Sequence, residues 1–233
     1  MNQEKNPKHI AIILDGNRRY GENIGNKFKG HKVGAKKVEE LFNWCKELGI
    51  KEVTLYCFST ENFNRPKEEV DYLMKLFKEQ FKRLKNNKRV NDGEVKINFI
   101  GRLDLFPLDL RKDMKELMKK TVGNKDFIVN FAVGYGGRGE IVDAVKKIIY
   151  KVKDNEIKVE DIDEAMFSEN LYMEDEPDIM IRPGGERRIS NFLIWQSNYS
   201  ELFFLDKLWP EFEKEDLVKV IEEFKRRERR FGE

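Results

Sequence analysis

Short apolar runs rich in β-branched residues alternate along this chain with longer stretches in which apolar residues recur at helical spacing. The short runs predict six strands, at His9–Leu14, Glu52–Phe58, Val95–Ile100, Phe127–Val133, Asp178–Ile181 and Leu202–Leu205. The longer stretches predict six helices, at Lys32–Leu48, Glu68–Lys85, Leu108–Thr121, Gly139–Lys153, Ile162–Glu169 and Glu213–Arg230. Such alternation is typical of a mostly parallel sheet flanked by helices. With no repeat or linker to divide the chain, we expect one α/β domain over residues 1–233.

Polar residues follow four of the predicted strands at the point where each strand ends. These segments are Asp15-Gly16-Asn17-Arg18-Arg19, Ser59-Thr60-Glu61-Asn62, Gly134-Tyr135-Gly136-Gly137-Arg138 and Arg182-Pro183-Gly184-Gly185-Glu186-Arg187-Arg188. The carboxyl ends of parallel strands meet at one edge of a sheet, and ligands bind there. The sequence therefore predicts a binding site at this edge, built from four loops.

The chemistry of these loops indicates a diphosphate and Mg²⁺ site. They combine a carboxylate, several guanidinium groups, which grip phosphate oxygens with two donors at once, and glycines that let backbone amides approach a ligand. Any one of these features alone is usually structural, and it is their joint occurrence that favours function. The chain lacks a P-loop and a dinucleotide fingerprint, which disfavours nucleotide binding. It also lacks the Asp-Asp-x-x-Asp motif of trans-prenyltransferases.

Composition and charge further limit the partners and the cellular setting that we expect. The 45 Lys and Arg residues nearly balance the 43 Asp and Glu residues, so the net charge is only +2. The basic tracts Lys82–Arg89 and Lys225–Arg230 are interrupted by other residues, and we do not expect a nucleic-acid partner. Cys45 and Cys57 lie in apolar runs and are interpreted as buried. These cysteines fit a reducing, cytoplasmic setting. The polar N-terminus and the lack of a long apolar stretch predict a soluble protein, and work at a membrane surface stays open.

Five segments, in this order and spacing, resemble the motifs of undecaprenyl diphosphate synthase and its cis-prenyltransferase relatives. They are HIAIILDGNRRY, GHKVGA, LYCFSTENFNRP, GYGGRGEIVDA and IRPGGERRISNFLIWQSNYSELFF, and the resemblance runs from about His9 to the terminal RRERRFG. It implies a Mg²⁺-dependent enzyme that adds isopentenyl diphosphate repeatedly to an allylic primer, farnesyl or geranylgeranyl diphosphate. The product would be a long-chain polyprenyl diphosphate that serves as a glycosyl carrier lipid and partitions into a membrane. Some relatives are non-catalytic partner subunits, but retention of Asp15, Arg19, Arg65, Arg182 and Arg188 argues against that alternative.

The resemblance also implies roles for single residues. Asp15 resembles the aspartate that holds Mg²⁺, and Glu201 resembles a second Mg²⁺ carboxylate whose counterpart lies near the partner subunit. The allylic diphosphate site would contain Gly16, Asn17, Arg18, Arg19 and His31. Ser59, Glu61, Asn62 and Arg65 resemble the family's FS-x-EN-x-x-RP segment, and with Thr60 they would contact substrate, Ser59 and Asn62 near the reacting atoms. The isopentenyl diphosphate site would contain Arg182, Arg188, Ile189 and Ser190.

Three substrate-site positions depart from the bacterial pattern. Tyr20 and Phe63 stand where bacterial members usually have Trp, and Lys27 stands where they have Arg. The first two keep an aromatic wall, while Lys27 keeps the charge without the bidentate fork. We therefore expect changed substrate affinity and the same reaction.

The identity of the proton acceptor stays open. The family's motif suggests Asn62, but an amide has no useful basicity near neutral pH, so Asn62 is better suited to orienting a diphosphate or a water molecule. The released diphosphate, or a relay through Ser59, is a better candidate. Product length, the preferred primer and the pathway are likewise left open by the sequence.

Two apolar surfaces carry further expectations. Val70, Leu73, Met74, Phe77, Phe81 and Leu84 form a stripe on one predicted helix, and Phe127, Val129 and Phe131 share one side of a strand. In the family such surfaces wall an apolar product tunnel, although ordinary core packing explains them equally well. A homodimer is expected from the family and from Leu217, Ile221 and Phe224, which have the alternative of packing on their own sheet.

Overall fold

A computed structural model of the chain describes residues 6–227. Its centre is one six-stranded sheet in which every pairing is parallel and the strand order is β3-β4-β2-β1-β5-β6. The strands are β1 (His9–Ile13), β2 (Glu52–Ser59), β3 (Val95–Ile100), β4 (Phe127–Tyr135), β5 (Ile179–Arg182) and β6 (Glu201–Phe204). The predicted α/β class, the parallel sheet and all six strands are confirmed, with small shifts at the strand ends.

The two faces of the sheet have different covers. Alternate residues such as Ile10, Ile12, Val53 and Leu55 point into the larger core, which is closed by four helices. These are α2 (Lys27–Glu47), α3 (Lys67–Lys85), α5 (Leu108–Thr121) and α8 (Lys214–Arg226). The intervening residues, Ala11 among them, face a smaller core that is covered by segments before and after β5, through Tyr172, Met173, Ile189, Phe192 and Leu193. Because β1 has a cover on both faces, all five of its residues are buried and its sequence is an unbroken apolar run after His9.

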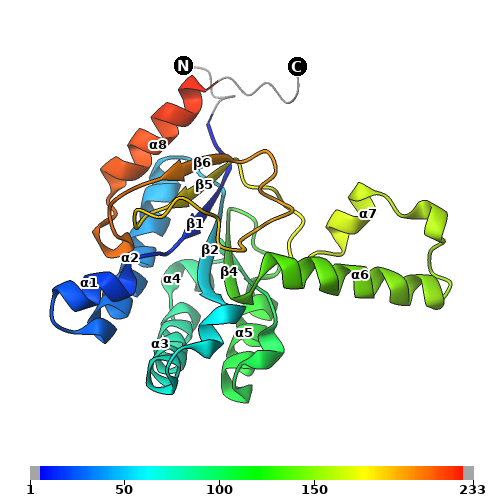
Figure 1. Cartoon of the computed structure of the whole chain (residues 1–233), viewed down its shortest axis with the longest axis horizontal. Coiled ribbons are helices and arrows are strands. Elements are labelled where there is room, and N and C mark those ends of the chain that lie inside the picture. The colour runs from blue at the N-terminus through cyan, green and yellow to red at the C-terminus, as the bar shows by residue number, and fades with distance from the viewer. Residues whose placement is uncertain (1–5, 228–233) are drawn as a thin grey trace.

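Two further helices form an arm that stands away from the sheet (Figure 1). Helix α6 (Gly137–Lys153) leaves the end of β4, and α7 (Glu164–Glu169) packs beside it. Only the inner face of α6 is buried, through Gly137, Glu140, Ala144 and Ile148. The arm therefore leaves one side of α6 without a partner within the described part of the chain.

Several helix boundaries differ from the sequence predictions. Helix α1 (Asn17–Asn23) was not predicted, because NRRYGEN is polar and has no apolar period. Short α4 (Lys88–Asn91) was also not predicted. Helix α2 starts at Lys27, earlier than predicted, since the Asn26 side chain caps it by accepting hydrogen bonds from Phe28 and Lys29. Helix α8 ends at Arg226, and residues 228–230 of the predicted helix lie outside the described residues.

The apolar positions of α8 face inward. Leu217, Ile221 and Phe224 are buried in the larger core, with at most 7% of their surface exposed. Their apolar character is thus explained by packing within the chain. They do not form the surface from which a dimer was expected.

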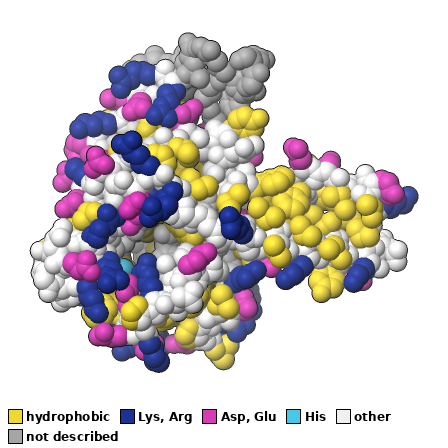
Figure 2. All heavy atoms as spheres, viewed as in Figure 1, with side chains coloured by type: hydrophobic (Ala, Val, Ile, Leu, Met, Phe, Trp, Pro, Cys, Tyr) yellow, Lys and Arg dark blue, Asp and Glu magenta, His cyan; other side chains and the backbone are white. Residues whose placement is uncertain are grey.

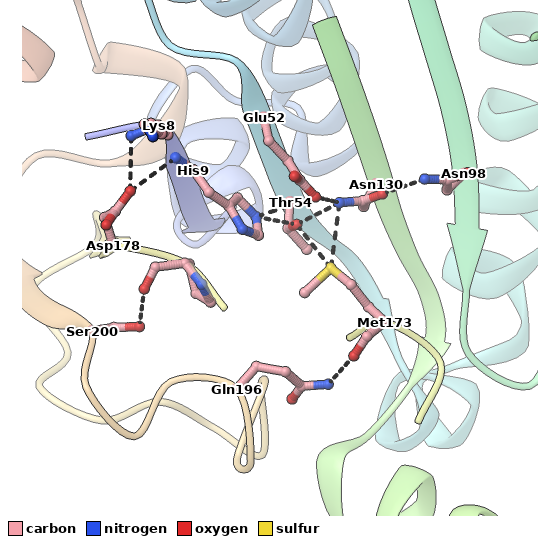
Figure 3. A network of polar contacts seen from close by, with 11 residues as sticks. Lys8, His9, Glu52, Thr54, Asn98, Asn130, Met173, Asp178, Gln196 and Ser200 are labelled. Atoms are coloured by element: carbon pink, nitrogen blue, oxygen red, sulfur yellow. Dashed lines mark hydrogen bonds and ion pairs between the residues drawn. The ribbon is translucent and has the colours of Figure 1, made fainter. Parts of the chain in front are cut away.

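A polar network lies near the amino ends of β1 and β2, at the edge opposite the predicted site (Figure 3). His9 Nε2 is 2.7 Å from Thr54 Oγ1, and Asn130 donates to Thr54 and to Glu52. Burial raises the pKa of Glu52 to about 7 and lowers the pKa of His9 to about 4. Both side chains are therefore held in an environment that disfavours charge.

Candidate active site

A polar pocket of about 270 Å³ opens at the carboxyl ends of the central strands. Its wall contains Asp15, Gly16, Asn17, Arg18, Arg19, His31, Ser59, Asn62, Arg65, Arg182 and Ser190. Three of the four predicted loops thus meet at this edge. The fourth, residues 134–138, lies behind the wall and contacts Asn191.

Asp15 and Arg182 form the centre of the wall. Asp15 follows β1 and Arg182 ends the neighbouring strand β5, so the sheet itself brings them together. Arg182 donates from Nη2 to Asp15 Oδ2 at 2.7 Å and from Nη1 to Ser190 Oγ at 2.6 Å. Arg19 donates to the other oxygen of Asp15 at 3.3 Å. With only 5% of its side chain exposed, Arg182 is a buried cation that depends on Asp15 for charge balance.

The close approach of Asp15 to the loop after β5 requires a glycine. Gly184 has φ of +103°, a value that side chains disfavour. A Cβ atom there would also lie 2.7 Å from Arg19 Nη2 and 3.2 Å from Asp15 Cβ. Gly184, the first glycine of the Pro-Gly-Gly segment, is therefore needed to bring this loop against Asp15.

A second carboxylate organises the cations of the pocket. Glu69, in the first turn of α3, is 3% exposed and lies 3.0 Å from Arg65, 3.7 Å from His31 and 3.9 Å from Arg18. It was not predicted from the sequence, although its i,i+4 spacing from Arg65 was a signal. Burial, followed by the charge of Arg65, lowers the pKa of His31. The lowered pKa favours the neutral form of His31, which lies beside three charged groups.

Ser59 and Asn62 cap each other. The Asn62 side-chain oxygen accepts a hydrogen bond from the Ser59 backbone N–H at 3.1 Å, and the Ser59 side chain accepts one from the Asn62 backbone. Because the amide oxygen of Asn62 is engaged in this turn, its –NH₂ group is left to donate. This geometry agrees with an orienting role for Asn62.

Several predicted substrate residues lie beside the pocket rather than on its wall. Phe63 stacks edge-on against Phe58 and Phe106 at centroid distances of 4.8 and 5.4 Å. Exposed Arg188 pairs with Glu186 at 2.6 Å, and Lys27 lies 3.5 Å from Glu68. The remaining members of this set are Tyr20, Thr60, Glu61 and Ile189.

Glu201 lies far from Asp15 within the chain. It is the first residue of β6, at the amino edge of the sheet, and it pairs with Arg227 at 2.7 Å. Asp15 follows the carboxyl end of β1, at the opposite edge. A shared metal would therefore need Glu201 from a second subunit, and its role as a metal ligand stays a prediction.

The residues of the pocket are suited to holding Mg²⁺ together with a substrate. Among the described residues of the wall, Asp15 is the only carboxylate, and no group of three or more potential metal ligands occurs within residues 6–227. Mg²⁺ is commonly bound by one or two carboxylates with phosphate oxygens and water completing the shell. Asp15 alone therefore fits an ion that arrives with a diphosphate.

The polar pocket continues into an apolar cavity of about 300 Å³ between α2, α3 and the sheet. Both hollows share the wall residues Leu14, Asn17, His31, Cys57 and Leu73. Of the expected stripe, Leu73, Phe77, Phe81 and Leu84 line the cavity, as do Val129 and Phe131 on β4. A ligand with a charged head and a hydrocarbon tail would thus meet a matching surface at each end.

Comparisons with known proteins agree with this geometry. Residues 13–232 match the family model for undecaprenyl diphosphate synthases. The chain is 49% identical over 231 residues to the tritrans,polycis-undecaprenyl-diphosphate synthase (geranylgeranyl-diphosphate specific) of Methanocaldococcus jannaschii, covering 97% of this chain and 82% of that protein. It is 51% identical over 229 residues to the Pyrococcus abyssi protein of the same name, covering 97% and 87%.

Solved structures show the same fold. The lavandulyl diphosphate synthase of Lavandula x intermedia, solved in complex with dimethylallyl diphosphate, has a TM-score of 0.92 at 34% identity, covering 99% of this chain and all of that one. A probable undecaprenyl diphosphate synthase from Campylobacter jejuni has a TM-score of 0.81 at 32% identity, with complete coverage of both chains.

Proposed function

The chain belongs to the undecaprenyl diphosphate synthase family of cis-prenyltransferases, and we propose that it extends geranylgeranyl diphosphate by repeated addition of isopentenyl diphosphate. The observation that carries this proposal is the continuity between the polar pocket and the apolar cavity. The diphosphate of the primer binds at the charged end, and its isoprenoid tail enters the cavity. The choice of a geranylgeranyl primer rests on the names of the relatives at about 50% identity.

In the proposed reaction the bond between the allylic carbon and its diphosphate oxygen breaks, and the electron pair leaves with the diphosphate. The alkene of isopentenyl diphosphate attacks that carbon, and loss of one proton completes the new cis double bond. Arg18, Arg19 and Arg65 stabilise the charge on the departing diphosphate. Mg²⁺ held by Asp15 would supply further neutralisation of that charge. Arg182, Ser190 and Arg188 hold the diphosphate of isopentenyl diphosphate, which fixes the two reacting carbons relative to each other.

Asn62 acts in this scheme as a donor that orients a diphosphate. Its side-chain oxygen is used in the turn with Ser59, and an amide is a poor base. The proton therefore passes to the released diphosphate, or through Ser59.

The decisive experiment is elongation with radiolabelled isopentenyl diphosphate and Mg²⁺, offered with dimethylallyl, farnesyl or geranylgeranyl diphosphate in separate reactions. We expect geranylgeranyl diphosphate to be used best and the products, sized by chromatography, to carry many added units. A single short product from dimethylallyl diphosphate would contradict the proposal, since a dimethylallyl complex is known for the lavandulyl relative. Omission of Mg²⁺ is expected to abolish turnover.

A homodimer is proposed through the arm rather than through α8. Figure 2 shows hydrophobic side chains gathered over α6 and α7. Val142, Val145, Ile149 and Tyr150 on α6 are 42–63% exposed, which is unusual for large apolar residues on one helix face. A second arm packing against this face would cover them. Sedimentation of the parent and of a Val145→Glu variant tests this, with a shift from dimer to monomer as the expected result.

The product is proposed to leave for a membrane and to serve there as a glycosyl carrier lipid, while the enzyme stays in the cytoplasm and works at the membrane surface. A long polyprenyl chain is strongly apolar, which supports release into lipid. Within the described residues, none of the helices has the length and apolarity that a membrane span requires. Flotation of the enzyme with vesicles, before and after product formation, is the corresponding measurement.

A further inference from the structure

Asn191 connects three parts of the chain that meet behind the pocket. Its side-chain nitrogen donates to Glu61 Oε1 at 3.1 Å, which joins it to the segment after β2. Its side-chain oxygen accepts from the backbone N–H of Arg138 at 2.9 Å, and its backbone oxygen accepts from Gly137 at 2.7 Å. Both of the latter donors belong to the first turn of α6. Three hydrogen bonds thus fix Asn191 to the segment after β2 and to the start of α6.

The backbone around Asn191 adopts a conformation that needs such support. Ser190, Asn191 and Leu193 have φ values of 49°, 63° and 43°, in the left-handed region that residues other than glycine seldom occupy. Each such residue carries a conformational cost that its surroundings must offset. Ser190, the neighbour of Asn191, is the residue that accepts the hydrogen bond from Arg182. The position of Asn191 therefore sets the position of a pocket residue.

We propose that Asn191 is a positioning residue that holds the loop of Arg188 and Ser190 at a fixed distance from the Ser59–Arg65 segment. This inference rests on the proposed function, in which these two segments bind different diphosphates. Glu61 belongs to the Ser59–Arg65 segment, and Ser190 belongs to the loop after β5. Asn191 connects the two, because it follows Ser190 in the chain and its side-chain amide donates to Glu61. The expected consequence is correct spacing of the two substrates during condensation.

The side chain of Asn191 also has a second, structural use that must be separated from the first. Gly136, which precedes α6, has no side chain to cap the helix, and the Asn191 oxygen takes that place. The two uses involve different atoms, because the oxygen caps α6 while the nitrogen donates to Glu61. Replacing Asn191 with Asp keeps the capping oxygen and the tolerance of left-handed backbone, but it removes the donor and places two carboxylates together.

The test is a double-mutant cycle of Asn191→Asp and Glu61→Gln, with steady-state kinetics for both substrates. In the parent background, Asn191→Asp is expected to raise the KM for isopentenyl diphosphate about tenfold, the effect of losing a hydrogen bond to a charged group. In the Glu61→Gln background, the introduced amide can donate to the introduced carboxylate, and the same change is expected to cost less than about threefold. The KM for the allylic primer is expected to move less than that for isopentenyl diphosphate in both backgrounds.

Asn155→Asp is the matched control. Asn155 also has a left-handed φ, 57°, but it is exposed at the far end of α6. The kinetics and the thermal unfolding of Asn155→Asp are expected to match those of the parent. An equal cost of Asn191→Asp in both backgrounds, or no cost in either, would overturn the positioning role. A parent enzyme without elongation activity would instead refute the proposed function, so the two failures are distinguishable.

Discussion

Nη2 of Arg182 lies 2.7 Å from Oδ2 of Asp15, although 167 residues separate the two in the chain. Strands β1 and β5 are neighbours, so their carboxyl ends deliver the carboxylate and the guanidinium to one point. The residue proposed to hold Mg²⁺ therefore also balances an arginine proposed to bind isopentenyl diphosphate. The two substrate sites share one wall, and a change at Asp15 is expected to affect both.

Replacing Asp15 with Asn is expected to lower kcat by at least about a hundredfold, because the pocket loses its carboxylate. Asn is preferable to Ala, since its amide oxygen can still accept a hydrogen bond from buried Arg182. Turnover at saturating substrates, measured across a range of Mg²⁺ concentrations, checks the prediction. The control is Asp71→Asn, which alters an exposed pair with Lys67. Near-parental turnover of the Asp15 variant would remove this residue from the mechanism.

Replacing Glu69 with Gln is expected to raise the KM for the allylic diphosphate about tenfold. Gln keeps the size of the side chain but no longer offsets the charges of Arg18 and Arg65, so these cations are held less firmly toward the pocket. Initial rates at varied primer concentration provide the measurement. The adjacent Glu68→Gln is the matched control, because the Glu68 side chain is 72% exposed. Equal effects of the two changes would show that the buried position of Glu69 is unimportant.

Changes in the apolar cavity are expected to alter product length. Cys57→Phe inserts a ring where the cavity meets the pocket and should shorten the product. Phe77→Ala removes a ring from the cavity wall and should lengthen it, at a folding cost below the roughly 3 to 5 kcal/mol of a fully buried ring, because Phe77 is only partly buried. Products are sized by chromatography after labelling. Phe212→Ala, a buried ring in the core away from the cavity, serves as the control for destabilisation alone.

If Cys57→Phe and Phe77→Ala both fold and give the parental product distribution, the cavity is ordinary core and does not limit the chain.

The buried carboxyl of Glu52 is expected to make stability depend on pH. Its folded pKa of about 7 is raised from 4.5, so folding favours the protonated form. Stability from this group is present below pH 4.5 and is lost as pH rises toward and through 7. Glu52→Gln, which can still accept from Asn130, should therefore stabilise the protein at pH 8 by about 2 kcal/mol and have little effect near pH 4.5. Urea unfolding at the two pH values measures the difference.

The contribution of His9 to stability depends on pH in the opposite direction and must be considered in the same experiment. Its pKa falls from 6.5 to about 4 on folding, so its contribution is present above pH 6.5 and is lost as pH falls toward 4. The parent and Glu52→Gln contain the same His9, and comparing them at each pH removes most of its contribution. A stability difference that is the same at pH 4.5 and pH 8 would contradict the raised pKa of Glu52.

The strands and the polar edge of the sheet were predictable from the sequence for a physical reason. A strand such as β1, covered on both faces, must be apolar throughout, and the loop after it is free to carry Asp15 and Arg18. Helix α1 was not predictable in this way, because it has no apolar stripe. It packs against α2 by close backbone approach at glycines. Gly30, for example, leaves no room for a Cβ atom, which would lie 1.9 Å from the Asn17 oxygen.

Single residues were harder to place than elements. Glu69 was overlooked because an acidic residue in the first turn of a helix is common on a solvated surface, and only the fold buries it. Glu201 was assigned by resemblance, which transfers a position in the sequence but not the subunit that would use it. Arg188 was predicted to bind isopentenyl diphosphate; its exposed side chain pairs with Glu186, and its role in substrate binding stays a prediction. The burial of Glu69 and the distance of Glu201 from Asp15 both follow from the tertiary fold.

The strand order also determines when the pocket forms as the protein folds. Asp15 lies between a loop after β2 and a loop after β5. Residues 14–178 separate β1 from β5 in the chain, so β5 can pair with β1 only after all of them have been synthesised. Contacts so distant in the sequence form slowly, because a long loop must close before they are gained. During synthesis a chain that ended before β5 would already contain Asp15, Arg19, Ser59 and Arg65, but not Arg182, the buried arginine that pairs with Asp15. The catalytic pocket is therefore completed late, when the last two strands join the sheet.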